Sequence, residues 1–314
     1  GSMRLDYVMS GNDTTFEISV HEYFHDPYWG GNPDHLVCEH VRGDFYFTIK
    51  DQTDEVVIYR SGFNALFAEW QTTREAKSIN RSFEGTLRFP YPKYPFCLSI
   101  YQRNGYHDDS LVFQIEIDPN DFLIEHRDPE KFEVNDIMIS GAPSKKADLV
   151  FLGDGYTKKE MNKYLADVKR FTNDLFTQAP FTRNKSKFNI RAVFIPSEDS
   201  GPDNPGLEIW NNTALNSSFY TFGSERYLTT KGYWKISDVA SVVPYDHIVI
   251  LVNTEKYGGG GIYNYYSLVA SDHEFSEIVM VHELGHGFAG LGDEYYTSDV
   301  AYSDFYDLNK EPVD

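Results

Sequence analysis

Residues 281–296, VHELGHGFAGLGDEYY, contain side chains whose types and spacing are typical of a metal site. His282 and His286 are four residues apart, and residues at that spacing lie on one face of an α-helix. Neutral imidazole nitrogens are common zinc ligands. Glu283 follows the first histidine, so it would reach the same edge of the helix without joining the ligands. The pattern predicts a Zn²⁺ site in which Glu283 is the catalytic general base.

No histidine follows His286, so a downstream third imidazole is excluded. His247 opens a buried strand, where we expect it to pack, and His273 lies just before the helix with its ring expected to turn away, so we expect a carboxylate as the third ligand. Gly290 is placed to end the helix and to reverse the chain. Such a turn would bring Asp293 or Glu294 back over the metal. We predict Asp293, seven residues after His286, with Glu294 as the alternative. The acidic residue that is not a ligand would orient a ligand histidine.

Two imidazoles and one carboxylate leave a fourth zinc position for water, whose pKa falls to about 7 on zinc. Glu283 would take the proton as the water attacks a carbonyl group, and would pass it to the leaving amine. Tyr295 or Tyr296 is a candidate hydrogen-bond donor to the oxyanion, and packing beneath the site is the simpler role for either one.

The histidines require a helix that is fixed against a core. We expect it to begin near residue 276, with Ser276 as a candidate N-cap. Gly285 and Gly287 lie inside this helix, where glycine costs about 1 kcal/mol relative to alanine, so they indicate a close approach of the backbone to a neighbour. Four apolar side chains are expected to face the core: Phe275, Ile278, Val279 and Phe288.

The second half of the chain reads as an α/β layer. ADLVFLGDG, FNIRAVFIP and HIVILVN are continuous apolar runs that predict strands buried on both faces. Thr157 and Glu160 form a capping-box pattern that opens a helix between the first two strands. The four glycines at 258–261 are either a simple flexible loop or a rim that leads into an edge strand beside a cleft.

The first half predicts an antiparallel β-sandwich. From Thr14 to about Glu125, short segments such as DFYFTIKD, FCLSIYQRN and LVFQIEID alternate between apolar and polar residues and are divided by turn sequences. The polar stretch around residue 130 separates the alternating segments of the first half from the continuous apolar runs of the second half. We therefore expect a multidomain α+β protein with a β-sandwich at 1–130 and an α/β domain with a mixed sheet and an active-site helix at 131–314.

Composition limits the partners. The 314 residues carry a formal net charge of −20, which disfavours nucleic acid and anionic membrane surfaces. No apolar run is long enough for membrane insertion. Gly1-Ser2-Met3 resembles a cloning remnant, which is compatible with a signal peptide that has been removed. Cys38 and Cys97 form either a disulfide or two thiols, and the sequence gives no indication of oligomeric state.

Three stretches resemble the IgA-peptidase family of bacterial zinc metallopeptidases: DLVFLGDGYTKKE, TALNSSFYTFGSERYLTT and VHELGHGFAGLGDEYY. The first half resembles the N-terminal β domain of that family. The resemblance implies a zincin-like catalytic domain and peptide-bond hydrolysis by a secreted or cell-surface protein of a host-associated bacterium. The family ligands would fall on His282, His286 and a carboxylate within Asp293–Glu294, with Glu283 catalytic.

One feature departs from related zinc peptidases, which often place a methionine turn under the metal. No methionine follows Met280. We expect either that the domain continues beyond residue 314 or that the floor of the site is built differently.

The leading hypothesis is a zinc endopeptidase that acts on host or dietary proteins and glycoproteins. A surface protein that binds glycans or proteins through its β domain and carries a degenerate metal site is one alternative. A zinc amidohydrolase that trims cell-wall peptides is the other.

Overall fold

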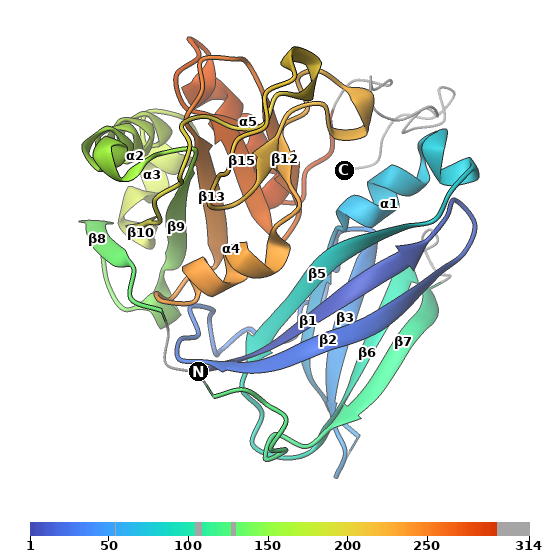
Figure 1. Ribbon diagram of the computed structural model, residues 1–314. Coiled ribbons are helices and arrows are strands. Elements are labelled where there is room, and N and C mark those ends of the chain that lie inside the picture. Colours follow the sequence, from blue (N-terminus) through green and yellow to red (C-terminus); the bar gives the residue numbers. More distant parts are fainter. Residues whose placement is uncertain (54, 104–108, 127–129, 294–314) are drawn as a thin grey trace.

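The computed structural model describes residues 1–53, 55–103, 109–126 and 130–293 of the chain (Figure 1). An all-β part is followed by a part in which helices cover a mixed sheet, so the predicted multidomain α+β architecture is confirmed. The boundary near residue 130 stays a prediction. Strand β8 (Glu133–Met138) already pairs with the sheet of the second part.

The N-terminal part is a sandwich of two antiparallel sheets, with strand orders β2-β1-β5 and β4-β3-β6-β7. Phe89 of β5 joins the sheets, because its ring centroid lies 6.0 Å from Phe47 of β3 and 5.7 Å from Phe96 of β6. The elements are β1 (Ser2–Gly11), β2 (Phe16–Asp26), β3 (Phe45–Asp51), β4 (Val57–Phe63), α1 (Leu66–Gln71), β5 (Arg81–Pro90), β6 (Phe96–Arg103) and β7 (Asp109–Ile117). Strand β1, buried along most of its length, is absent from the sequence prediction.

The second part is built on a six-stranded sheet with the order β14-β15-β13-β9-β10-β8. Neighbours from β15 to β10 are parallel, whereas β14 and β8 are antiparallel edge strands. Its elements after β8 are β9 (Ala147–Asp154), α2 (Met161–Leu175), α3 (Phe181–Asn184), β10 (Phe188–Phe194), β11 (Ser217–Ser218), β12 (Thr229–Thr230), α4 (Tyr233–Ala240), β13 (His247–Val252), β14 (Gly259–Ile262), β15 (Tyr266–Ala270) and α5 (Ser276–Gly287).

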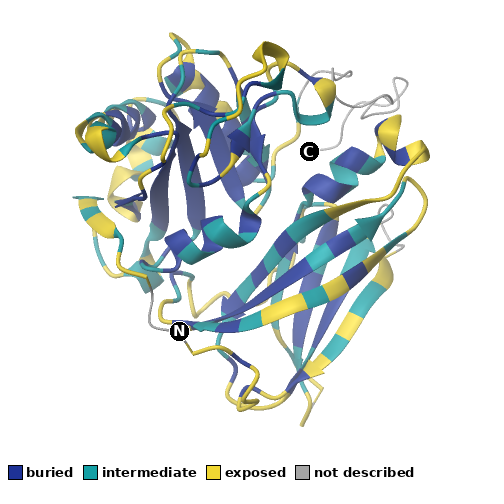
Figure 2. Ribbon diagram, in the orientation of Figure 1, coloured by how far each residue is buried: buried dark blue, intermediate teal, exposed yellow. Residues whose placement is uncertain are grey.

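Helices cover both faces of this sheet, which explains its continuous apolar strands (Figures 1 and 2). Along β9, Leu149 and Phe151 belong to the core under α2 and α5. Val150 and Leu152, which point to the opposite face, belong to the core under α4. The predicted capping box is present at Thr157 and Glu160, in a short 3₁₀ turn directly before α2.

Two properties of the chain can be read from the fold. Cys38 and Cys97 are free thiols. Across the described residues, every helix is too short or too polar to span a lipid bilayer.

Candidate metal centre

Helix α5 carries both predicted histidines and packs on the sheet through one stripe of residues. Ser276, Met280, Leu284 and Gly287 recur every three or four positions and are buried, and Val279 is buried beside them. His282 lies on the other side of the helix and is exposed, and His286 is partly exposed. The helix therefore presents its histidines away from the core that fixes it.

Two expectations for this helix were wrong. The side chains of Phe275 and Ile278 are 51% and 65% exposed instead of facing the core. They precede His282 by seven and four residues, so they share its side of the helix. Ser276 is the first helical residue, preceded by Phe275 at the N-cap position, and no side-chain cap is formed.

Close packing fixes the C-terminal half of α5. A Cβ atom on Gly287 would lie 2.5 Å from Ser267 Oγ and 2.8 Å from His247 Cε1, so only glycine fits. Ser267 Oγ donates a hydrogen bond of 2.8 Å to the carbonyl oxygen of Glu283. The expected close approach thus holds for Gly287, whereas a Cβ on Gly285 would meet no atom closer than 3.8 Å.

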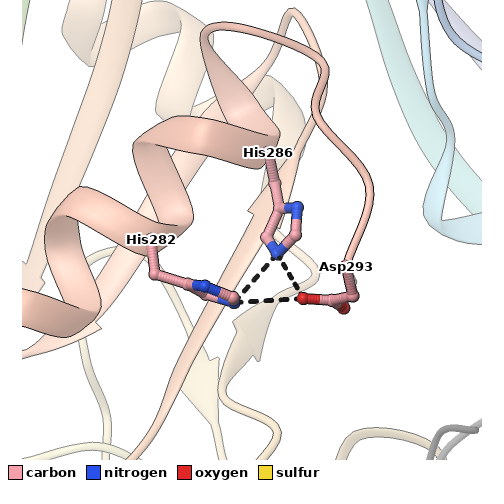
Figure 3. A group of neighbouring side chains, drawn as sticks. All are labelled: His282, His286 and Asp293. Atoms are coloured by element: carbon pink, nitrogen blue, oxygen red, sulfur yellow. Dashed lines mark hydrogen bonds and ion pairs between the residues drawn. The ribbon is translucent and has the colours of Figure 1, made fainter. Parts of the chain in front are cut away.

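The two imidazole rings converge, as the spacing predicts. Their Nε2 atoms are 3.0 Å apart, and the ring planes are nearly perpendicular, at 88° (Figure 3). His286 Nδ1 lies 2.8 Å from the carbonyl oxygen of Leu291. A carbonyl only accepts, so Nδ1 carries the proton and the lone pair of a neutral ring is on Nε2.

The chain reverses after α5 and returns a carboxylate to the rings. Gly290 has a φ of +64°, and its N–H donates to the carbonyl oxygen of His286 at 3.0 Å. Beyond this turn, Asp293 Oδ1 lies 3.3 Å from His282 Nε2 and 3.2 Å from His286 Nε2 (Figure 3). Within the described residues, these three side chains are the group that could hold a metal ion.

The three donor atoms fit a zinc ion. They form a nearly equilateral triangle with edges of 3.0, 3.2 and 3.3 Å. Tetrahedral zinc with bonds of about 2.0–2.1 Å to nitrogen and oxygen places neighbouring ligand atoms about 3.3–3.4 Å apart. The triangle therefore matches one face of a coordination tetrahedron, and the fourth vertex is left for water or substrate.

The charges at the site favour a cation. Contact with Asp293 raises the pKa of His282. Burial lowers the pKa of His286, but Asp293 and the Leu291 carbonyl outweigh it and raise that pKa to about 9. The carboxylate that stabilises a proton on these rings would equally stabilise a divalent ion in its place.

Glu283 lies outside the donor triangle and against strand β14. It is 8% exposed, and burial raises the pKa of its carboxyl group to about 7. A Cβ on Gly259 would lie 2.7 Å from Glu283 Oε1, and one on Gly261 would lie 3.1 Å from Oε2. Three of the four glycines at 258–261 thus lie in the edge strand β14, and the missing side chains of Gly259 and Gly261 make room for this carboxylate.

Some predicted residues cannot be placed. Glu294, Tyr295 and Tyr296 lie outside the described residues. The choice of Asp293 over Glu294 as third ligand stays a prediction, although Asp293 reaches both rings. The oxyanion role of the two tyrosines also stays a prediction.

The β domain contacts the elements around the metal centre, which the sequence did not predict. Arg42 Nη1 donates to the carbonyl oxygen of Ala289, which follows α5, at 2.7 Å. Asn264, in the turn between β14 and β15, donates to the carbonyl oxygen of Gly62 at 2.9 Å. The phenol of Tyr227, beside β14, donates to Glu69 Oε2 of α1 at 2.6 Å.

Comparison with known proteins agrees with this architecture. A family model described as IgA Peptidase M64 matches residues 136–314. A second, described as Peptidase M64 N-terminus, matches residues 1–114. No curated protein matches the chain.

Proposed function

The chain belongs to the IgA peptidase M64 family, and from this premise we propose that it is a zinc-dependent endopeptidase acting on host or dietary proteins and glycoproteins. The observation that carries the zinc assignment is the donor triangle of His282, His286 and Asp293. Bound zinc would supply a Lewis acid that lowers the pKa of water and polarises a carbonyl group.

Glu283 performs the proton transfers in this proposal. Its carboxylate accepts the proton that water loses as the water oxygen attacks the carbonyl carbon of the peptide bond. It then delivers that proton to the leaving nitrogen, so the C–N bond breaks to give a carboxylate and an amine. Its raised pKa, about 7, suits a group that both takes and gives a proton near neutral pH.

The sequence features around Glu283 argue against a degenerate binding site. Both histidines, the glutamate and the returning carboxylate are present, and Gly259 and Gly261 leave space for the glutamate. Export from the producing cell is part of the proposal, because host and dietary proteins are extracellular. Detection of the protein in the culture medium of the cells that produce it naturally would test the proposed export.

Glu283→Gln tests the proposed reaction. We expect it to lower the cleavage of quenched protein substrates by roughly 10²- to 10⁴-fold while zinc content is unchanged. The matched control is Glu274→Gln, an exposed glutamate just before the same helix, which should cleave normally. Full cleavage by Glu283→Gln would show that Glu283 is not the general base. A parallel screen of muropeptides separates a protein substrate from a cell-wall substrate.

A further inference from the structure

Helix α1 of the β domain is held between the cores of both domains. Leu66 belongs to the core cluster of the second domain, beneath α4. Phe67 and Trp70, on the same short helix, are fully buried in the core of the β-sandwich. The indole Nε1 of Trp70 also donates to Glu75 Oε2 at 2.7 Å. The helix therefore has a fixed position on the side of the β domain that faces the second domain (Figure 1).

Glu69 projects from this helix toward the metal centre. Its Oε2 accepts the 2.6 Å hydrogen bond from the Tyr227 phenol. Tyr227 pairs with Gly259 of β14, the strand that borders Glu283. The charges of His286 and Asp293 act on the Glu69 carboxyl group, and Glu69 in turn acts on Glu283. Glu69 is thus part of the electrostatic environment in which the reaction would occur.

Among the residues that the structure describes, the Glu69 carboxylate has a hydrogen bond at one oxygen and forms no ion pair. Tyr227 donates that hydrogen bond to Oε2, and no lysine, arginine or histidine in the described part of the chain lies within ion-pair distance of the carboxylate. Burial raises the pKa of Glu69 to about 7 against the opposing effect of the His286 charge, because ionisation of a buried carboxyl group costs free energy. Carboxylates in such positions are normally paired, and Glu69 is partly exposed, so a group from solution can approach it.

We propose that Glu69 forms a subsite beside the metal centre for a positively charged group of the peptide substrate. The group is an ammonium or guanidinium, supplied either by a lysine or arginine side chain or by a free N-terminus. The inference rests on the proposed peptidase function. It makes the β domain a determinant of substrate choice, because the β domain supplies the carboxylate and the catalytic domain supplies the phenol that orients it.

Binding can be measured without turnover. Zinc-loaded Glu283→Gln protein is titrated with labelled peptides that differ only in lysine or norleucine at one position, scanned across the peptide. We expect one position at which lysine binds at least about tenfold more tightly, and we expect Glu69→Gln in the same background to remove that preference. Free and N-acetylated forms of each peptide distinguish the two sources. If the N-terminus is the bound cation, acetylation weakens every peptide by about tenfold and Glu69→Gln removes that difference; if a side chain is bound, acetylation leaves the lysine preference unchanged.

The control variant is Glu17→Gln, on an exposed position of β2, which should keep the preference. Thermal denaturation checks that Glu69→Gln remains folded, and Tyr227→Phe should weaken the preference without abolishing it. Equal binding of lysine and norleucine at every position together with no effect of N-acetylation, or a preference that survives in Glu69→Gln, would overturn the proposal. Failure of the proposed peptidase is seen separately, as the absence of cleavage by zinc-loaded protein with Glu283 intact.

Discussion

His286 Nδ1 lies 2.8 Å from the carbonyl oxygen of Leu291, so the turn that ends α5 also sets the orientation of the second imidazole. The same turn returns Asp293 to both rings. One local reversal of the chain therefore determines the tautomer of one candidate ligand and the position of another. Such supporting contacts commonly affect metal affinity almost as strongly as the ligands themselves.

Gly290→Ala should weaken zinc binding by roughly 10- to 100-fold. Gly290 has a φ of +64°, where a residue with a Cβ is strained by about 1 kcal/mol. The new Cβ would also lie 2.8 Å from the Tyr263 ring. Competition titration with a chromophoric chelator measures the affinity.

Gly285→Ala is the matched control for that substitution. A Cβ at position 285 lies within the helix and would meet only Leu291, at an ordinary contact distance of 3.8 Å, so alanine should raise the free energy of unfolding by up to about 1 kcal/mol and leave zinc affinity unchanged. Wild-type affinity in Gly290→Ala would show that the turn does not position the ligands.

Gly259→Ala should lower kcat while zinc remains bound. The added Cβ would come within 2.7 Å of Glu283 Oε1 and 2.8 Å of Val279 Cγ1, and the flexible carboxylate is the group that moves more easily. Displacement of a catalytic base by about 1 Å can lower the rate roughly 100-fold. Peptide hydrolysis and zinc content are measured on the same sample. An unchanged kcat would mean that Glu283 does not need its position against β14.

Removal of zinc should lower the melting temperature of the wild-type protein by several degrees. A metal present at 100 times its Kd stabilises the folded state by about 2.7 kcal/mol. Differential scanning fluorimetry with and without 1,10-phenanthroline measures the shift, and re-added zinc should restore it. His282→Ala should show no shift. An equal shift in that variant would place the stabilising ion elsewhere.

Acid should destabilise the packing beneath α5 through His247. Burial lowers the pKa of His247 from 6.5 to about 3 in the folded chain. Below pH 6.5 the unfolded state takes up a proton that the folded state does not. The free energy of unfolding therefore decreases as the pH is lowered, by at most about 1.4 kcal/mol per pH unit. The free energy of unfolding continues to decrease until the pH approaches about 3, the pKa of His247 in the folded chain.

His247→Asn isolates this contribution, because asparagine can replace the hydrogen bond to Ser267 but does not titrate. Urea denaturation between pH 7 and pH 5 should show a smaller pH dependence for the variant than for the wild type. Equal slopes would contradict the assignment to His247.

Local patterns in the sequence predicted the core of the candidate site, because its residues are close together in the chain. His282, His286 and Gly290 follow helix periodicity and turn chemistry, so the convergence of the rings and the return of Asp293 could be expected. The strands of the sandwich and the capping box at Thr157 were predictable for the same reason.

Long-range contacts were not predictable. Glu69 and Tyr227 are 158 positions apart, and neither lies in a recognisable motif. An acidic residue within the apolar segment LFAEWQ is the one available signal, and it does not identify a partner. Phe275 and Ile278 were assigned to the core by residue type alone, whereas the position of the sheet determines which face of α5 is buried.

We expect one zinc ion to bind between His282, His286 and Asp293. Anomalous diffraction at the zinc absorption edge, from crystals of the zinc-loaded protein, tests it most directly. The expected result is a single strong peak about 2.0–2.1 Å from Nε2 of both histidines and from a carboxylate oxygen of Asp293. No peak between the rings, or a zinc ion held by other residues, would show that these three side chains are not the zinc ligands.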